Sequence, residues 1–214
     1  MRLLLSQPSW DASGHELTCV VFGSGLTTIG DWAFSGCHDL TSIILPDSVR
    51  RIGANAFSYC SRLSNVAIPD GVTYIGDSAF YGCNGMTNIT VGVGNANYSS
   101  ANGLLLSKDG KLLIQGVNGN VTIPRGVVCV GQRAFYGCGD LTSVTLPDTV
   151  ADILAGAFQN CYSLATTNKN VQFSCFHRTP CIVNLAIAIH VARRALVVVV
   201  LVEPLHALGE PLGD

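Results

Sequence analysis

The sequence has few charged side chains and no basic run. Charged residues make up 12% of its 214 residues, and the formal net charge is -2. A typical globular domain carries about 25% charged residues. Surfaces that bind DNA or RNA need clustered Lys and Arg, so the composition argues against a nucleic-acid partner. Abundant Ser, Thr, Asn and Gly must supply most of the polar surface.

The first residues lack the long apolar run of a secretory signal. The chain begins MRLLLSQPSWDASG, in which three leucines are soon followed by Ser6, Gln7 and Pro8. A signal peptide has an apolar core of about 7–15 residues. We therefore read no signal peptide in this chain and assign residues 1–16 as a lead-in. The chain is then either cytosolic or a piece of a longer protein.

Motifs for catalysis and for metal or cofactor binding are also missing. The stretch GVGNAN from Gly92 matches only the first two glycines of a phosphate-binding loop. Cys175, His177 and Cys181 lack the paired spacing of a structural zinc site. No Ser stands in the G-x-S-x-G spacing of a nucleophile elbow. The sequence therefore predicts a protein that is not an enzyme and has no cofactor or metal.

What the chain does contain is a repeat. The stretch IGDWAFSGC at Ile29 returns as IGANAFSYC at Ile52 and IGDSAFYGC at Ile75, 23 residues apart each time. The repeated residues are Phe34, Phe57, Phe80, Phe135 and Phe158, with Cys37, Cys60, Cys83, Cys138 and Cys161 three positions later. The interval of 55 between the third and fourth copies is two periods plus nine residues. Such a period indicates a solenoid with one longer coil.

One coil is best seen between Leu40 and Cys60. Apolar residues alternate in LTSIILP, which favours a short strand with one buried face. Pro46 ends this strand, and Gly53 permits a sharp bend. The segment ANAF then predicts a short helical or 3₁₀ turn on the opposite side, and a unit this small must stack on its neighbours to bury its apolar side. We expect the cysteines to be free thiols in the core, with disulfides between coils as the alternative.

The pattern LxxIxLPxxVxxIGxxAFxxC resembles the BspA-like class of leucine-rich repeat over about residues 17–164. The resemblance implies an α/β leucine-rich-repeat solenoid whose parallel β-sheet has one short strand per coil. Members of this family are associated with microbial and protist cell surfaces and with adhesion to host matrix proteins. A cell-surface or secreted location is therefore implied by the resemblance alone.

We assign residues 17–166 to the solenoid, with an insert at about 92–117. The segment NYSSANGLLLSKDGKLLIQGVNGNVTIP resembles the recurrent insert of this family. Its central part, LLLSKDGKLLI, predicts a β-hairpin with Lys108, Asp109 and Gly110 at the turn. The hairpin is expected to replace the strand-opposite half of the coil that begins at Met86.

Residues 167–214 form a hydrophobic tail without the repeat. The stretch 182–202 is long enough to cross a membrane, but Arg193 and Arg194 stand near its middle. We favour a buried or amphipathic helix that caps the stack over a membrane anchor. A third interpretation is that the tail is the product of a frame change or truncation. All three interpretations remain open.

The outward positions of the strands are the expected partner-binding surface, because repeat proteins bind along extended surfaces. A second candidate face consists of aromatic loop residues, chiefly Tyr59, Tyr81 and Tyr136, together with Trp32 and His38. The outward strand positions are Ser42, Ile44, Asn65, Ala67, Asn88, Thr90, Ser143 and Thr145, with Cys19 and Val21 in the first coil.

The sequence thus predicts a non-enzymatic module that binds a protein or glycan partner, with cell-surface adhesion implied by the resemblance. One alternative is an intracellular interaction scaffold with reduced cysteines. The other is a truncated or degenerate fragment of a larger surface protein.

Overall fold

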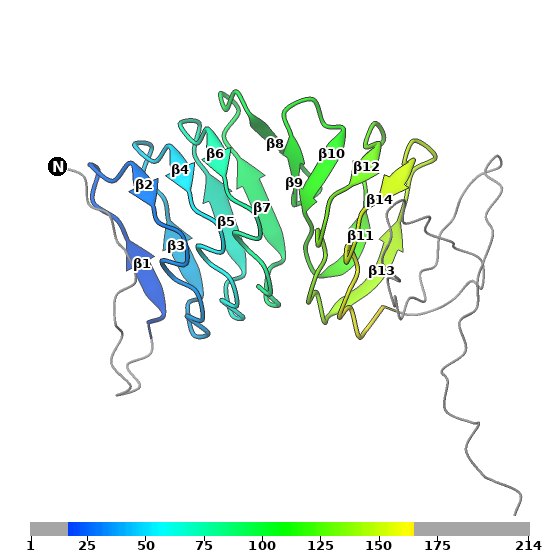
Figure 1. Cartoon of the computed structure of the whole chain (residues 1–214), viewed down its shortest axis with the longest axis horizontal. Helices are drawn as coiled ribbons and strands as arrows, with labels where there is room; N and C mark the ends of the chain where they lie inside the picture. Colours follow the sequence, from blue (N-terminus) through cyan, green and yellow to red (C-terminus); the bar gives the residue numbers. More distant parts are fainter. Residues whose placement is uncertain (1–16, 165–214) are drawn as a thin grey trace, which may run out of the picture.

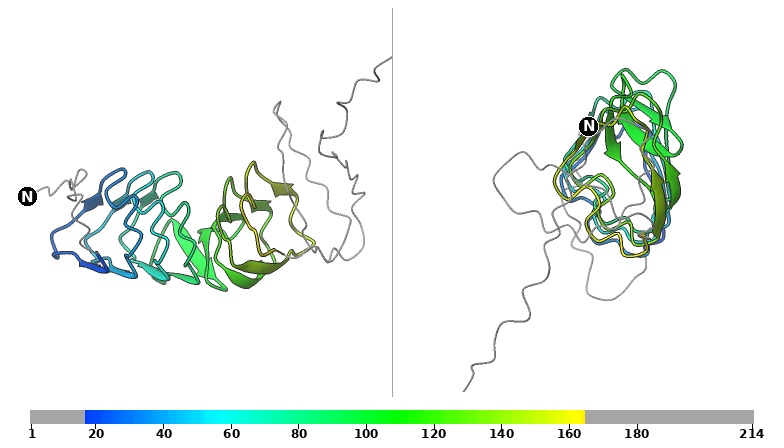
Figure 2. Two further views of the ribbon diagram at one scale, coloured as in Figure 1. Left: turned by 90° about the horizontal axis from the view of Figure 1, so that it is seen from below. Right: turned by 90° about the vertical axis from the view of Figure 1, so that its right-hand side faces the viewer.

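The computed structural model describes residues 17–164, which form a stack of six coils (Figure 1). The coils follow one another from the blue end to the yellow end, and in the end view their outlines lie nearly over each other (Figure 2). The interior of each coil is filled by apolar side chains, so that one continuous core runs along the stack.

One longer strand per coil builds the surface that we call the strand face. Its first block is a parallel sheet in the order β1 (Cys19–Val21), β3 (Ser42–Ile44), β5 (Asn65–Ile68) and β7 (Asn88–Val91). Its second block pairs β11 (Gly119–Thr122) with β13 (Leu141–Thr145), also in parallel. The parallel solenoid that the repeat predicted is therefore present.

Each coil also has a second strand, which was not predicted from the sequence. The short strands β2 (Thr28–Ile29), β4 (Arg51–Ile52) and β6 (Tyr74–Ile75) form their own parallel sheet. Coils approach closely where this strand ends: a Cβ on Gly53 would lie 2.5 Å from the backbone nitrogen of Asp31. The repeated glycine therefore permits close approach between coils rather than a left-handed bend.

The expected helical or 3₁₀ turns are not supported, because residues 17–164 contain no helix. A left-handed residue recurs two positions before each core phenylalanine, for example Trp32 (φ 60°) and Asn55 (φ 52°), and it interrupts any right-handed helix. Backbone N–H groups also bond to the next coil instead of along a helix. Phe34 N donates to Ala56 O at 2.7 Å, and Phe57 N donates to Ala79 O at 2.8 Å.

The insert is an antiparallel meander. Strand β9 (Leu104–Ser107) pairs with β10 (Leu112–Gln115), which gives the hairpin predicted around Lys108–Gly110. Strand β8 (Tyr98–Ala101) was not predicted, and it pairs with β9 through a turn at Asn102 and Gly103. Strand β10 then continues the stack, in parallel with β12 (Cys129–Val130) and, beyond it, β14 (Asp152–Ile153).

Phenylalanine rings form the centre of the core. Phe34, Phe57 and Phe80 stack in order, with ring centroids 5.3 and 5.7 Å apart, and Phe135 stacks on Phe158 at 4.9 Å. All five side chains are buried. The ladder is divided into these two runs at the insert.

The expectations for the lead-in at 1–16, the tail at 167–214 and the span at 182–202 concern residues that lie outside those described. Within residues 17–164, no helix has the length and apolar character needed to cross a membrane.

Candidate partner-binding surface

Strand pairing lines up the outward residues of the strand face in two columns. In the first column Cys19 pairs with Ser42, Ser42 with Asn65, and Asn65 with Asn88. In the second column Val21 pairs with Ile44. Ala67 pairs with Thr90 further along the same column. Because side chains alternate across a strand, the residues between these columns, such as Ile43 and Val66, are buried in the core.

The strand residues predicted as a binding surface differ in exposure. Ser42, Ile44, Asn65, Ala67, Thr90 and Thr145 are exposed, whereas Asn88 and Ser143 are half-buried. Val21 is 71% exposed and Ile44 is 61% exposed. These two aliphatic side chains lie side by side on neighbouring strands and give the surface an apolar end.

Two residues of this surface were not among the predicted set. Asn120 pairs with Ser143, and Thr122 pairs with Thr145, in the second block. The Asn120 side-chain oxygen accepts hydrogen bonds from Ser143 Oγ at 2.8 Å and from Thr142 Oγ1 at 2.7 Å. A signal was available, because these residues stand one period of 23 before Ser143 and Thr145.

The β8–β9 turn lies between the two blocks of the strand face. Gly103 O accepts a hydrogen bond from Ile89 N of β7 at 2.8 Å. The Asn102 side-chain amide donates to Thr122 O of β11 at 2.9 Å. Asn102 (φ 54°) and Gly103 (φ 77°) are both left-handed, which is the geometry of a tight type I′ hairpin turn. The insert thereby joins the two blocks.

The six long strands contain no charged residue. The polar atoms of the strand face belong to the hydroxyl and amide groups of Ser, Thr and Asn. Its apolar area is provided by Val, Ile and Ala. Such a surface recognises partners by hydrogen bonds and apolar contact. It has no cation for a phosphate backbone.

The tyrosines of the second candidate face contact one another. Tyr81 stacks on Tyr136 with centroids 4.1 Å apart, and Tyr59 meets Tyr81 edge-on at 5.1 Å. Burial, followed by hydrogen bonding with Tyr136 and Tyr59, raises the pKa of Tyr81. Asn160 Nδ2 donates to Tyr136 Oη at 2.8 Å. The stack thus connects the third coil to the fifth, and mainly Tyr59, 46% exposed, offers area to a partner.

The other two candidates for this face, Trp32 and His38, are not part of the tyrosine stack. Trp32 is 47% exposed in the first coil, and its backbone N–H donates to Ala54 O of the second coil at 2.9 Å. The side chain of His38 is exposed, and the backbone carbonyl of His38 accepts a hydrogen bond from Arg62 N at 3.2 Å. The structure does not bring either residue into the tyrosine stack.

The seven described cysteines are free thiols. The Cys60 thiol donates to Phe34 O and the Cys83 thiol donates to Phe57 O, each at 3.1 Å. Each of these hydrogen bonds joins two neighbouring coils. Burial raises the pKa of Cys60 and of Cys161 to about 12. A thiol with such a pKa is unreactive near neutral pH.

Within residues 17–164 no cluster of His, Cys, Asp or Glu is placed to hold a metal ion, and Cys175, His177 and Cys181 lie outside the described residues.

The GVGNAN stretch has a structural role. Asn95 is fully buried, and its side-chain amide donates to Pro69 O and to Val72 O, both at 2.9 Å. Its side-chain oxygen accepts from the backbone N–H groups of Asn97 and Tyr98, both at 2.8 Å. Every polar atom of this amide is therefore used to fix the start of the insert on the third coil.

Known structures with a similar fold include two bacterial proteins. A leucine rich cell surface protein from Faecalibacterium prausnitzii is 35% identical, with a TM-score of 0.58, and the match covers 69% of this chain and 40% of that one. The pneumococcal vaccine antigen PcpA is 24% identical, with a TM-score of 0.63, and the match covers 70% of this chain and 38% of that one. The chain thus spans less than half the length of either protein. No curated protein matches it.

A family model identifies the repeat. The model of the BspA type leucine rich repeat region matches six copies over residues 12–102 and 118–191. The two segments cover well over half of the 214 residues, and the unmatched gap at 103–117 lies within the insert that the structure shows between β7 and β11. The chain therefore belongs to the BspA-type leucine-rich repeat family.

Proposed function

We propose that the strand face binds an extended partner and that the chain is a non-enzymatic recognition module. The observation that carries this proposal is the alignment of exposed, uncharged residues across four neighbouring strands. Such columns present hydrogen-bonding and apolar groups at the regular spacing of a sheet, about 4.8 Å. An extended segment can follow this spacing over several coils.

The composition of the surface favours a protein partner, with a glycan as the second candidate. The exposed pair Val21 and Ile44 offers aliphatic area to apolar side chains of a protein. The hydroxyls and amides of Ser42, Asn65 and Thr90 are the groups that favour a glycan. Since the Faecalibacterium relative is described as a cell surface protein, we further propose that the module acts in adhesion at a cell surface.

The test uses one charge introduced at two places. Asn65→Lys puts a cation in the middle of the strand face, and Thr27→Lys puts the same charge at an exposed position away from it. Binding to immobilised fibronectin and to a glycan array is measured by surface interferometry and fluorescence for both variants and for the parent chain. We expect Asn65→Lys to weaken binding about tenfold while Thr27→Lys leaves it unchanged.

Equal binding by both lysine variants would contradict a role for the strand face. Binding only to glycans would select the second candidate. Absence of binding to every probe, with circular dichroism showing a folded chain, would count against adhesion to matrix proteins and glycans.

A further inference from the structure

Three asparagine side chains follow one another along the first column of the strand face. Asn65 of β5 pairs with Asn88 of β7. Asn120 of β11 is the counterpart of Asn88 in the next coil, because Asn118 N donates to Met86 O at 2.8 Å and the two pairs share an offset of 32 residues. We call Asn65, Asn88 and Asn120 the asparagine row.

Each amide of the asparagine row keeps hydrogen-bonding capacity for a partner. The Asn65 side-chain nitrogen donates to Ser64 Oγ at 2.9 Å, which leaves the Asn65 side-chain oxygen as an acceptor. The Asn120 oxygen accepts from two neighbouring hydroxyls, which leaves the Asn120 side-chain nitrogen as a donor. Within residues 17–164 the Asn88 side chain makes no hydrogen bond, so its oxygen and its nitrogen are both free.

The free atoms of Asn88 can be reached from solvent. All buried polar side-chain atoms of residues 17–164 have a hydrogen-bond partner, so the unpaired Asn88 atoms are not buried. Gly103 lies beside them, and a Cβ there would be 3.1 Å from the Asn88 oxygen. The glycine therefore leaves this oxygen uncovered. A half-buried amide without a partner gains when a ligand supplies one.

The asparagine row matches the main chain of an extended peptide. A side-chain amide and a peptide group both carry a C=O acceptor and N–H donors, so they can pair at two points. The row offers an acceptor at Asn65, an acceptor and a donor at Asn88, and a donor at Asn120. Six extended residues span about 20 Å, which equals about four strand spacings. Such a segment is long enough to follow the whole row.

Two features of the strand face favour a peptide over a glycan. The six long strands contain no Trp, Tyr or Phe, so the surface has no ring on which a sugar can stack. Val21 and Ile44 are 71% and 61% exposed at one end of the same surface. These two side chains offer apolar contact to the side chains of a peptide.

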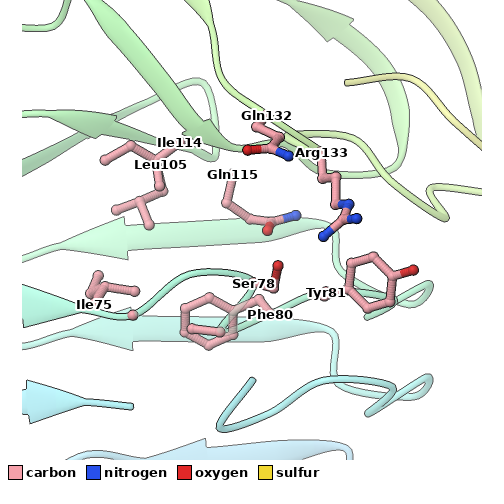
Figure 3. A pocket seen from close by; sticks show the side chains of 11 residues that line it. Ile75, Ser78, Phe80, Tyr81, Leu105, Ile114, Gln115, Gln132 and Arg133 are labelled. Carbon is pink, nitrogen blue, oxygen red and sulfur yellow. The ribbon is translucent and has the colours of Figure 1, made fainter. Parts of the chain in front are cut away.

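The pocket at the insert does not offer an alternative site (Figure 3). Its volume is about 40 Å³, which is room for one or two water molecules. Leu105 and Phe80 belong to its lining, and both side chains are buried. A peptide or a sugar therefore finds no apolar surface to contact there.

We propose that the asparagine row binds the main chain of an extended, uncharged polypeptide segment. Main-chain N–H groups donate to the oxygens of Asn65 and Asn88, and main-chain carbonyls accept from the nitrogens of Asn88 and Asn120. Binding then depends on the peptide groups of the partner more than on its side chains. This inference rests on the function proposed for the strand face and names the chemistry recognised there.

The test is a calorimetric titration of the full chain with acetyl-Thr-Val-Thr-Val-Thr-Val-amide and with its ester analogue. The analogue has oxygen in place of the peptide N–H groups between its residues and keeps every side chain. We expect it to bind at least about tenfold more weakly. Asn88→Leu should weaken the peptide and reduce the difference between peptide and analogue. Asn97→Leu, at an exposed position outside the long strands, should change neither.

Three results would overturn the proposal: equal binding of peptide and analogue, no heat of binding at millimolar peptide, or an unchanged difference in a folded Asn88→Leu variant. The comparison on the parent chain decides the matter even if Asn88→Leu does not fold. If Asn88→Leu lowers binding to a glycan on the array and leaves the peptide unaffected, the row serves a glycan and the peptide assignment fails.

Failure of this inference can be told apart from failure of the proposed function. Suppose that Asn65→Lys weakens fibronectin binding while peptide and ester analogue bind equally. The strand face then binds a partner through its side chains, so the proposed function stands and main-chain recognition falls. Equal binding of fibronectin and glycans by Asn65→Lys and Thr27→Lys would instead contradict the proposed function itself.

Discussion

At the scale of single residues, the recurring phenylalanine and cysteine are fixed by stacking. Phe57 lies between Phe34 and Phe80, and the Cys60 thiol bonds to the carbonyl of Phe34 one coil earlier. Each residue thus contacts the equivalent part of the neighbouring coil, so the same side chain is needed once per period. Both positions were found from the sequence because spacing alone reveals them.

Truncation of the central ring should be costly. Phe57→Ala removes a fully buried side chain with rings on both sides. We expect the free energy of unfolding to fall by about 3–5 kcal/mol in urea titration. Tyr59→Ala, two residues away and half exposed, should cost much less. A loss below about 1 kcal/mol at Phe57 would contradict the stacked core.

The buried thiols should make stability depend on pH in the alkaline range. Burial raises the pKa of Cys60 from 9.0 to about 12. Between these values the unfolded chain has lost this proton and the folded chain still holds it, so the folded state is destabilised as the pH rises. The contribution is fully present below pH 9 and lost as the pH approaches 12.

The measurement is the melting temperature at a series of pH values from neutral to strongly alkaline. Cys60→Ala should flatten the alkaline decline relative to the parent chain. Cys19→Ala, at an exposed thiol on β1, serves as the control. Equal flattening by both substitutions would show that the buried position of Cys60 is not the cause.

At the scale of elements, the sequence predicted the strand positions better than the turns. The β3, β5 and β7 strands follow directly from apolar alternation. The turns before Phe34 and Phe57 were expected to be helical, because Ala-Phe beside polar residues is also typical of helix. The left-handed residues Trp32 and Asn55 both donate backbone hydrogen bonds to the next coil, and of the two only Asn55 is of a residue type that favours this conformation.

The insert shows a signal that was present but not used. The dipeptide Asn102-Gly103 is a strong mark of a tight hairpin turn, and the structure has this turn between β8 and β9. The candidate site was affected in the same way. Asn120 and Thr122 belong to the strand face, but the insert shifts them out of simple register with the first block.

Replacement of the turn glycine should weaken this junction. Gly103 has φ 77°, a conformation that is unfavourable for a residue with a Cβ. We expect Gly103→Ala to lower the free energy of unfolding by about 1–2 kcal/mol in urea titration. Gly139→Ala, at a glycine without positive φ and with its nearest neighbour atom 4.0 Å away, is the matched control and should change little. Similar losses in both would argue against the turn geometry.

At the scale of the whole molecule, stability should be local along the stack. Contacts between strands run from each coil to its neighbours, as in the pairs β1–β3, β3–β5 and β5–β7. In such an array, damage to one coil affects adjacent coils first. The insert and the Tyr81–Tyr136 stack connect the two halves.

Hydrogen exchange measured by mass spectrometry should show this locality. In the Phe57→Ala variant, we expect the largest increase in exchange within residues 17–83, with a smaller change in residues 141–164. A uniform increase over residues 17–164 would instead indicate that the stack opens as one cooperative unit.

The hydrogen bonds across the insert also bear on how the chain folds. Ordinary steps of the stack close a loop of 23 residues, as in Thr41 N to Thr18 O, whereas Asn118 N reaches Met86 O, 32 residues earlier. The entropic cost of closing a loop grows only with the logarithm of its length. Closing the 32-residue loop therefore costs only about 0.3 kcal/mol more than closing a 23-residue loop. Folding that propagates coil by coil therefore meets almost no extra entropic barrier at the insert. A solenoid of this kind can acquire a meander and a pocket in mid-stack while its folding route stays nearly that of an uninterrupted repeat.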